Sequence, residues 1–308
     1  MSASHFPGPV PASTICKVGG SPWAWHWHPV AWVLIATSAV GYCQLLFGLP
    51  VGRWKRALGQ PTTGQVTCFG LGLASVATAV TWPVADLAQH WSLLARMVQQ
   101  LLLVLVSAPL LLLGIPRSAY ASATRNRLVD TGLRAITRPV PAALIFSTVA
   151  LGCLSPDVVD AQAHSWLLDA AVEVALCLAG LVMWLPVLRL LPDGRHLSIG
   201  GRMGYLFVIS ILPNFPALLF IFAQHPFYAV YADHSGLFGL SPLADQQVAG
   251  AVTKLAGILV LWGTAALIWV RGEKAQNAGL DPDPLTWNDV QRELERAERR
   301  NRKRSTAG

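Results

Sequence analysis

The stretch RMVQQLLLVLVSAPLLLLGIP, residues 96–116, decides which class of fold this chain adopts. Its apolar part is long enough to cross a lipid bilayer as one helix, since about 20 residues span the hydrocarbon core. The stretch nevertheless begins with Arg96 and carries Gln99 and Gln100 near its start. These three side chains are spaced three and four residues apart, so they share one helical face. Because polar groups are costly in lipid, we predict that this face points into a bundle of helices.

The composition of the whole chain also favours a membrane protein. The 308 residues are 53% hydrophobic and 13% charged, with a mean hydropathy of +0.47. A soluble domain would be about one quarter charged. The first 28 residues hold one lysine and no apolar signal-peptide core, so we expect a flexible tail there. The cysteines lack CxxC or CxxxC spacing, which indicates neither a disulfide framework nor a zinc site.

Seven apolar stretches predict seven transmembrane helices. They are Val30–Leu49, Val66–Val84, Met97–Ile115, Val140–Leu154, Trp166–Leu191, Tyr205–Phe222 and Val248–Val270. The predicted fold class is all-α, a polytopic membrane helix bundle. We divide it into an outer tail (1–28), a seven-span domain (29–271) and a cytoplasmic tail (272–308) that carries a charged amphipathic helix.

Basic residues gather in every second loop and predict the orientation. Of the 23 Lys and Arg residues, only Lys17, Arg96 and Lys254 fall on the opposite side of the predicted membrane. The positive-inside rule then places the N-terminus outside and the C-terminus in the cytoplasm. We expect a multi-pass protein of the bacterial inner (plasma) membrane. Topology explains the net charge of +7, so no nucleic-acid partner is indicated.

Ionisable side chains at membrane depth are functional candidates. Asp86, Arg96, Glu173 and Lys254 fall in the outer half of the predicted spans. Their signs suggest two interhelical ion pairs, Asp86 with Arg96 and Glu173 with Lys254. The alternative is a polar pocket open to the outer face. Its predicted lining is Asp86, Arg96, Gln99, Gln100, Glu173, Asp245, Gln246 and Lys254.

Seven of the eight histidines fall on the predicted outer side, and imidazole is a good ligand for copper and zinc. The candidate metal ligands are His26, His28, His90, His225 and His234. The competing interpretation of the segment WAWHWH, residues 23–28, is an aromatic belt at the membrane surface.

Three segments resemble the CtaG-type cytochrome c oxidase assembly proteins, which are multi-span bacterial membrane proteins. In residues 86–116 the matching positions are Asp86, Met97, Gln99, Pro109, Gly114 and Pro116. The segment GLVMWLPV, residues 180–187, is similar to a Gly-Leu-x-x-Trp-x-Pro element of that family. The third segment, residues 228–252, contains Tyr228, Tyr231, Ser241, Asp245, Gln246, Gln247 and Gly250, which fit a Tyr-x-x-Tyr stretch and a Leu-Ser-x-Leu-x-Asp-Gln-Gln-x-x-Gly motif.

The chain departs from this family pattern where the family carries intramembrane histidines. Arg96 and Gln100 stand where the family shows two histidines, and Lys254 stands in a region where a Met-Trp pair is common. Arginine cannot bind a metal cation, and a nearby lysine repels one. The resemblance therefore implies a retained scaffold with a rewritten metal site.

The resemblance implies a non-enzymatic assembly factor, or chaperone, for a haem–copper oxidase of the respiratory chain. It would act at the outer face, with maturation of a copper centre as one form of that role. The expected partners are the lipid bilayer, oxidase subunits and copper ion. The alternative is a small-solute or copper transporter, although no inverted repeat is apparent. An intramembrane enzyme is disfavoured, because the sequence shows no nucleophile–base pattern or cofactor fingerprint.

Overall fold

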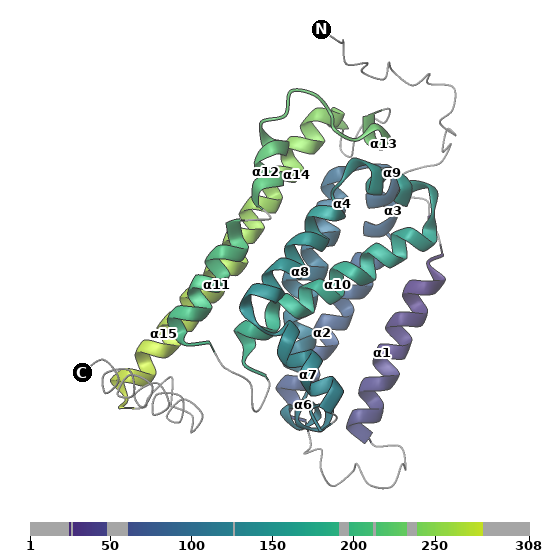
Figure 1. Ribbon diagram of the computed structural model, residues 1–308. Coiled ribbons are helices and arrows are strands. Elements are labelled where there is room, and N and C mark those ends of the chain that lie inside the picture. Colours follow the sequence, from purple (N-terminus) through teal and green to yellow (C-terminus); the bar gives the residue numbers. More distant parts are fainter. Residues whose placement is uncertain are drawn as a thin grey trace, which may run out of the picture.

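A computed structural model describes residues 25, 27–47, 61–125, 127–190, 197–211, 214–232 and 239–279. Every regular element within these ranges is a helix, and the long helices form a bundle (Figure 1). The all-α prediction is therefore confirmed. Most of the predicted outer tail, and the predicted helix of the cytoplasmic tail, lie outside the described residues.

Within the described residues, five helical stretches are long and apolar enough to cross a membrane, and they coincide with five of the predicted spans. They are Thr63–His90, Leu93–Gly114, Trp166–Leu188, Ile199–Ile221 and Pro242–Asn277. In chain order they comprise α2 (Thr63–Val80) and α3 (Val84–His90); α4 (Leu93–Leu101), the π-helix η2 (Leu102–Ser107) and α5 (Ala108–Gly114); α10 (Trp166–Leu188); α11 (Ile199–Ile211) and α12 (Asn214–Ile221); and α14 (Pro242–Gly257), the π-helix η4 (Ile258–Trp262) and α15 (Gly263–Asn277). The chain is thus a multi-pass membrane protein.

The first and fourth predicted spans differ from these five. Helix α1 (Pro29–Phe47) has a shorter apolar stretch, which ends at Gln44. The fourth corresponds to α8 (Pro139–Gly152), and α7 (Arg127–Ile136), which precedes it, meets it at a bend of 74°. Arg138 is extended there, because the ring of Pro139 disfavours a helical conformation in the preceding residue. The count of seven spans and their orientation stay predictions.

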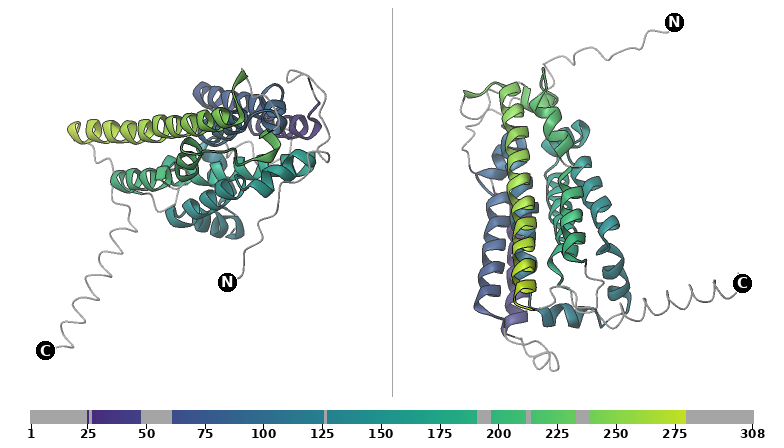
Figure 2. Two further views of the ribbon diagram at one scale, coloured as in Figure 1. Left: turned by 90° about the horizontal axis from the view of Figure 1, so that it is seen from above. Right: turned by 90° about the vertical axis from the view of Figure 1, so that its left-hand side faces the viewer.

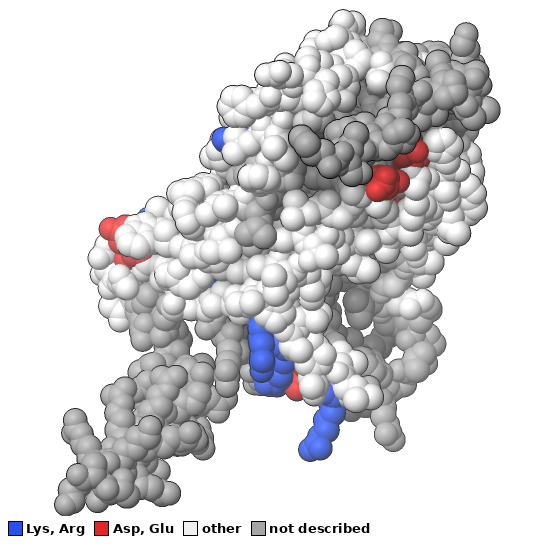
Figure 3. Space-filling view, turned by 45° about the horizontal axis from the view of Figure 1, so that its top comes forward, with Lys and Arg blue, Asp and Glu red and all other residues white. Residues whose placement is uncertain are grey.

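Short helices close both ends of the bundle (Figure 1). Helices α3, α9 (Pro156–His164) and α13 (Ala229–Ala232) lie at one end, here called the cap end. Helices α6 (Arg117–Ala123) and α7 lie at the other, here called the basic end. The continuous rod α14–η4–α15 runs along the bundle between these ends (Figure 2). Charged side chains are sparse among the described residues seen in Figure 3.

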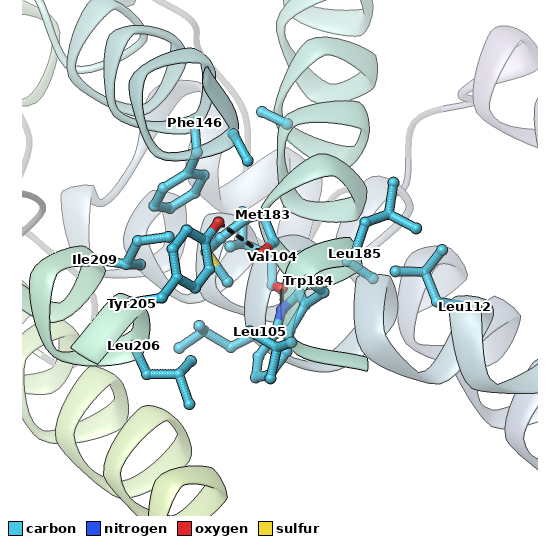
Figure 4. Packing of buried hydrophobic residues seen from close by; sticks show 14 of the residues in the cluster. Val104, Leu105, Leu112, Phe146, Met183, Trp184, Leu185, Tyr205, Leu206 and Ile209 are labelled. Carbon is cyan, nitrogen blue, oxygen red and sulfur yellow. Dashed lines mark hydrogen bonds between the residues drawn. The ribbon is translucent and has the colours of Figure 1, made fainter. Parts of the chain in front are cut away.

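The π-helix η2 lies directly before Ala108 and Pro109. In its wider turns the N–H of Ala108 donates to the carbonyl of Leu103, five residues earlier. The carbonyl of Val104 would then need the N–H of residue 109, which is a proline and has none. The indole Nε1 of Trp184 on α10 donates to this carbonyl instead, at 2.8 Å (Figure 4). Two segments of the family-like pattern are thereby joined by one hydrogen bond.

The main hydrophobic cluster surrounds this contact. It packs Phe146 of α8 and Met183 of α10 against Ile209 of α11, all at most 5% exposed. The Tyr205 hydroxyl of α11 donates to the carbonyl of Met183 at 2.9 Å (Figure 4). Gly180 lets α10 approach the third span closely, since a Cβ there would lie 3.1 Å from the Cα of Val104. This packing sets the rotation of α10, and hence the direction in which its acidic residues point.

Candidate functional site

Arg96 is the centre of a buried polar network at the cap end. Its side chain is 2% exposed and arises from the first turn of α4. The guanidinium Nε donates to the carbonyl of Ala88 on α3 at 3.2 Å and lies 3.3 Å from the Tyr231 hydroxyl on α13. Nη1 donates to Gln162 Oε1 on α9 at 2.7 Å and to Asp169 on α10 at 3.2 Å. One side chain of α4 therefore connects four other helices.

The charge of Arg96 is balanced by Asp169, whose side chain is 11% exposed. The predicted ion pair between Asp86 and Arg96 is wrong. The α3 helix presents the carbonyl of Ala88 to Arg96, while Asp86 Oδ1 lies 3.1 Å from Nε2 of His28. The sequence prediction missed Asp169 as the partner because an acid in the first turn of a helix is usual for electrostatic reasons alone.

Tyr231 completes the network from the loop side. Its hydroxyl donates to the carbonyl of Ala88 at 2.6 Å. Burial raises the pKa of Tyr231, so the phenol stays protonated and remains a donor. Tyr228 similarly donates to the carbonyl of Leu154 at 2.7 Å, and burial raises its pKa also. The Tyr-x-x-Tyr stretch thus attaches α13 to the bundle.

A second polar contact joins α4 to α10 one turn further along. Gln99 Nε2 donates to Glu173 Oε1 at 2.6 Å, and Gln99 is 2% exposed. Arg96 and Gln99 on one helix thus meet Asp169 and Glu173 on the other. The predicted pair between Glu173 and Lys254 is wrong, because Glu173 faces α4 whereas Lys254 is on α14.

Asp245 holds the N-terminus of α4. Its Oδ1 accepts from the Ser92 hydroxyl at 2.7 Å, and its Oδ2 accepts from the backbone N–H groups of Leu93 at 2.7 Å and Leu94 at 3.3 Å. A carboxylate is favoured at this position by the free N–H groups and the dipole of the helix. Asp245 therefore fastens α14 to α4 and is 2% exposed.

The two glutamines after Asp245 hold the loop between α12 and α13. Gln246 Oε1 accepts from the N–H of Phe227 at 2.8 Å, and Gln247 Nε2 donates to the carbonyl of Ala223 at 3.1 Å. At Gly250, helix α14 approaches α12 so closely that a Cβ on residue 250 would lie 2.6 Å from the carbonyl oxygen of Ala217. The Asp-Gln-Gln-x-x-Gly pattern is thus explained by packing and hydrogen bonding.

Five of the eight residues predicted to line a polar pocket are instead enclosed by protein, and one of them, Asp86, is 6% exposed. Arg96, Gln99, Asp245 and Gln246 are each 2% exposed. Gln100 lines a cavity of about 90 Å³, and its Nε2 has no hydrogen-bond partner among the described residues. Glu173 lines a different cavity between α1 and α10. The predicted pocket residues that are not buried are Gln100, Glu173 and Lys254. Ligand binding by these residues stays a prediction.

The residues present do not fit a copper site in the described part of the chain. His28 lies beside Asp86, His90 is half-buried in α3, and His225 is exposed with its ring edge-on to Phe227. His26 and His234 lie outside the described residues. Within those residues no group of three or more His, Cys, Asp or Glu side chains could hold a metal ion. The central cation, Arg96, repels one.

Comparison with known proteins supports the resemblance seen in the sequence. A family model described as cytochrome c oxidase caa3 assembly factor (Caa3_CtaG) matches residues 45–272. The matched range contains Arg96, Asp169, Trp184 and Asp245. Neither the curated proteins nor the solved structures provide a match. The family match gives no support to the transporter alternative.

Proposed function

Because the chain belongs to the family of cytochrome c oxidase caa3 assembly factors, we propose that it binds an oxidase subunit during assembly of the enzyme. The proposed contact surface is the cap end, formed by α3, α9 and α13 and the residues around them. We also propose that this end faces outward from the bacterial inner membrane, since the arginine-rich basic end then faces the cytoplasm.

The Arg96 network is the observation that carries this proposal. Short helices such as α13, with four residues, are not stable alone. Arg96, Tyr231 and Asp245 attach the cap end to the long helices through hydrogen bonds buried from solvent. Such an arrangement gives a preorganised surface, which lowers the entropy cost of binding a partner.

Exposed aromatic side chains at the same end supply the apolar contact area. Trp166 at the start of α10 is 65% exposed, and Trp27 before α1 is 63% exposed. Aromatic residues are enriched both at protein interfaces and at membrane surfaces. A contact with a membrane-bound subunit is both a protein interface and close to the membrane surface. We therefore place the contact with the subunit around these tryptophans.

The proposal includes no catalytic step and no metal-transfer step by this chain. Arg96 uses its hydrogen bonds to hold neighbouring helices, and the described residues do not form a copper site. An effect on the copper centre of the oxidase would then follow from how the subunit is held. Added copper should therefore not replace the protein.

The test uses a strain that lacks this chain and is complemented with variants. Arg96→Met should lower haem a absorbance and oxidase-bound copper at least about fivefold, with unassembled subunits still present, because a buried Asp169 without its partner disrupts the cap end. The matched control is Arg134→Met, which removes an exposed arginine that pairs with Asp130 at the basic end. It should leave the oxidase content unchanged.

A surface variant separates binding from folding. Trp166→Ala alters an exposed side chain, so the chain should accumulate normally while oxidase content falls. Normal oxidase in the strain without the chain would refute the proposed function. Normal oxidase with both Trp166→Ala and Trp27→Ala would refute the cap end as the contact surface. Rescue by added copper would favour a metal-supply role instead.

A further inference from the structure

A second cavity, of about 320 Å³, lies between α1, α2, α5 and α10, and Glu173 in its wall is one helical turn from Asp169 of the Arg96 network. Its volume is within the range of small-molecule sites, about 300–1,000 Å³. Most of its wall is aliphatic, as with Leu34 of α1, Val76 of α2 and Leu111 of α5. Because these helices lie at membrane depth, the cavity borders the hydrocarbon part of the bilayer. We refer to it as the α1–α10 slot.

Helix α1 is fastened to the bundle at both ends of the slot. At one end His28 lies 3.1 Å from Asp86. At the other end the Tyr42 hydroxyl donates to the carbonyl of Gly114 at 3.0 Å, and its ring stacks on Phe69 with centroids 3.7 Å apart. A helix of a partner protein is about 10 Å wide, so it could enter the slot only by displacing the contacts that fasten α1. A flexible hydrocarbon chain would not have to displace them.

Glu173 gives the slot its chemical specificity. It is the one charged residue among those that line the cavity. Gln99 donates to its Oε1 at 2.6 Å and is its hydrogen-bond donor within the described residues. The carboxyl group therefore retains an acceptor oxygen in an apolar wall, where an unsatisfied polar group is unfavourable. A ligand that brings a donor into this wall would satisfy it.

We propose that the α1–α10 slot binds a single-chain amphiphile from the bilayer, whose polar group donates a hydrogen bond to Glu173. The aliphatic chain lies along Leu34, Val76 and Leu111, and the hydroxyl or amine meets the carboxyl oxygen that Gln99 leaves unoccupied. This site adjoins the cap end, where Asp86 of α3 contacts His28, but none of its lining residues belongs to the Arg96 network. It does not depend on the proposed role in oxidase assembly.

The test uses the full chain in phosphatidylcholine nanodiscs with two photoreactive probes. One is a 12-carbon alcohol with a diazirine near the chain end, and the other is its methyl ether, which cannot donate a hydrogen bond. Irradiation followed by peptide mapping should place the alcohol on α1 and α10. The alcohol should label these helices about fivefold more than the ether, as expected for one hydrogen bond.

Two variants make the result specific. Glu173→Met keeps the side-chain length but removes the acceptor, so the alcohol and the ether should label equally. Leu34→Trp fills the slot from α1 and should reduce labelling by both probes about fivefold. Its matched control is Leu219→Trp, an exposed leucine on α12 outside the slot, which should change nothing.

Three outcomes would overturn the proposal. They are labelling spread evenly over all lipid-facing helices, equal labelling by the two probes in the unaltered chain, and unchanged labelling in Leu34→Trp. If Glu173→Met fails to accumulate, the comparison of the two probes and the Leu34→Trp variant still decide the question. Oxidase content is measured separately, so a failure here leaves the proposed assembly role untouched.

Discussion

Trp184 compensates for a backbone donor that the chain lacks at Pro109. The carbonyl of Val104 is buried beside α10 and receives its hydrogen bond from the indole Nε1 at 2.8 Å. Without that bond, a buried carbonyl would be left unsatisfied at membrane depth, where water cannot replace the donor. The tryptophan is therefore required for its N–H group as well as for its volume.

We predict that Trp184→Phe destabilises the protein by about 1–3 kcal/mol, the cost of leaving a buried acceptor unpaired. The thermal unfolding midpoint in detergent micelles should fall. The matched control, Trp269→Phe, alters a tryptophan that is 56% exposed on α15 and should leave the midpoint nearly unchanged. Equal midpoints for Trp184→Phe and the unaltered chain would show that Val104 does not need this donor.

The prediction from the sequence that Arg96 and Gln99 point into the bundle is confirmed, because both residues are 2% exposed. The rule that polar groups avoid lipid is enough for this prediction. It does not select partners, because the choice of Asp169 for Arg96 depends on the rotation of α10 about its axis. That rotation is set by contacts such as Gly180 against Val104, which no local pattern encodes.

A single glycine determines how closely helices α12 and α14 pack against each other. Gly250 lies against the carbonyl oxygen of Ala217, and a Cβ there would also lie 2.9 Å from the Cβ of Phe220. Small residues at helix crossings are the usual means of close packing in membranes. The same close approach brings Asp245 to the N-terminus of α4 and Gln246 to the adjoining loop.

We predict that Gly250→Ala forces α12 away from α14 and destabilises the protein by about 1–3 kcal/mol, as overpacking does. Gly263→Ala is the matched control, because a Cβ at Gly263 meets nothing within 4 Å. Alanine there should be neutral or slightly stabilising, since it forms helices better than glycine. The two unfolding midpoints in detergent decide between packing and propensity; a loss of the same size in both variants would contradict the packing explanation.

The positions of the five long apolar helices could be predicted from hydropathy, but their interruptions could not all be predicted. The bend between α7 and α8 has a local signal in Pro139. For the π-helix η2, the third span itself shows only Pro109, which cannot donate to the Val104 carbonyl. The donor that replaces it, Trp184, comes from α10. Interruptions that depend on a second helix are not visible in one segment.

On the scale of the whole molecule, the cap end and the basic end differ in chemistry. Exposed arginines such as Arg127 and Arg134 lie at the basic end, whereas the buried Arg96 lies at the cap end with its charge paired. Only exposed basic residues near the membrane surface are expected to orient a membrane protein. The orientation predicted from the sequence, with the cap end outside, agrees with this asymmetry and stays a prediction.

We predict that single cysteines report this orientation. In a variant without native cysteines, Ala161→Cys on α9 should react with a membrane-impermeant maleimide in intact spheroplasts of a bacterial host. Ala121→Cys on α6 should react only after the membrane is permeabilised. Both positions are exposed in the structure, so access from the solvent depends on the side of the membrane. The opposite pattern would place the cap end in the cytoplasm. It would move the proposed contact with the oxidase subunit to the cytoplasmic face as well.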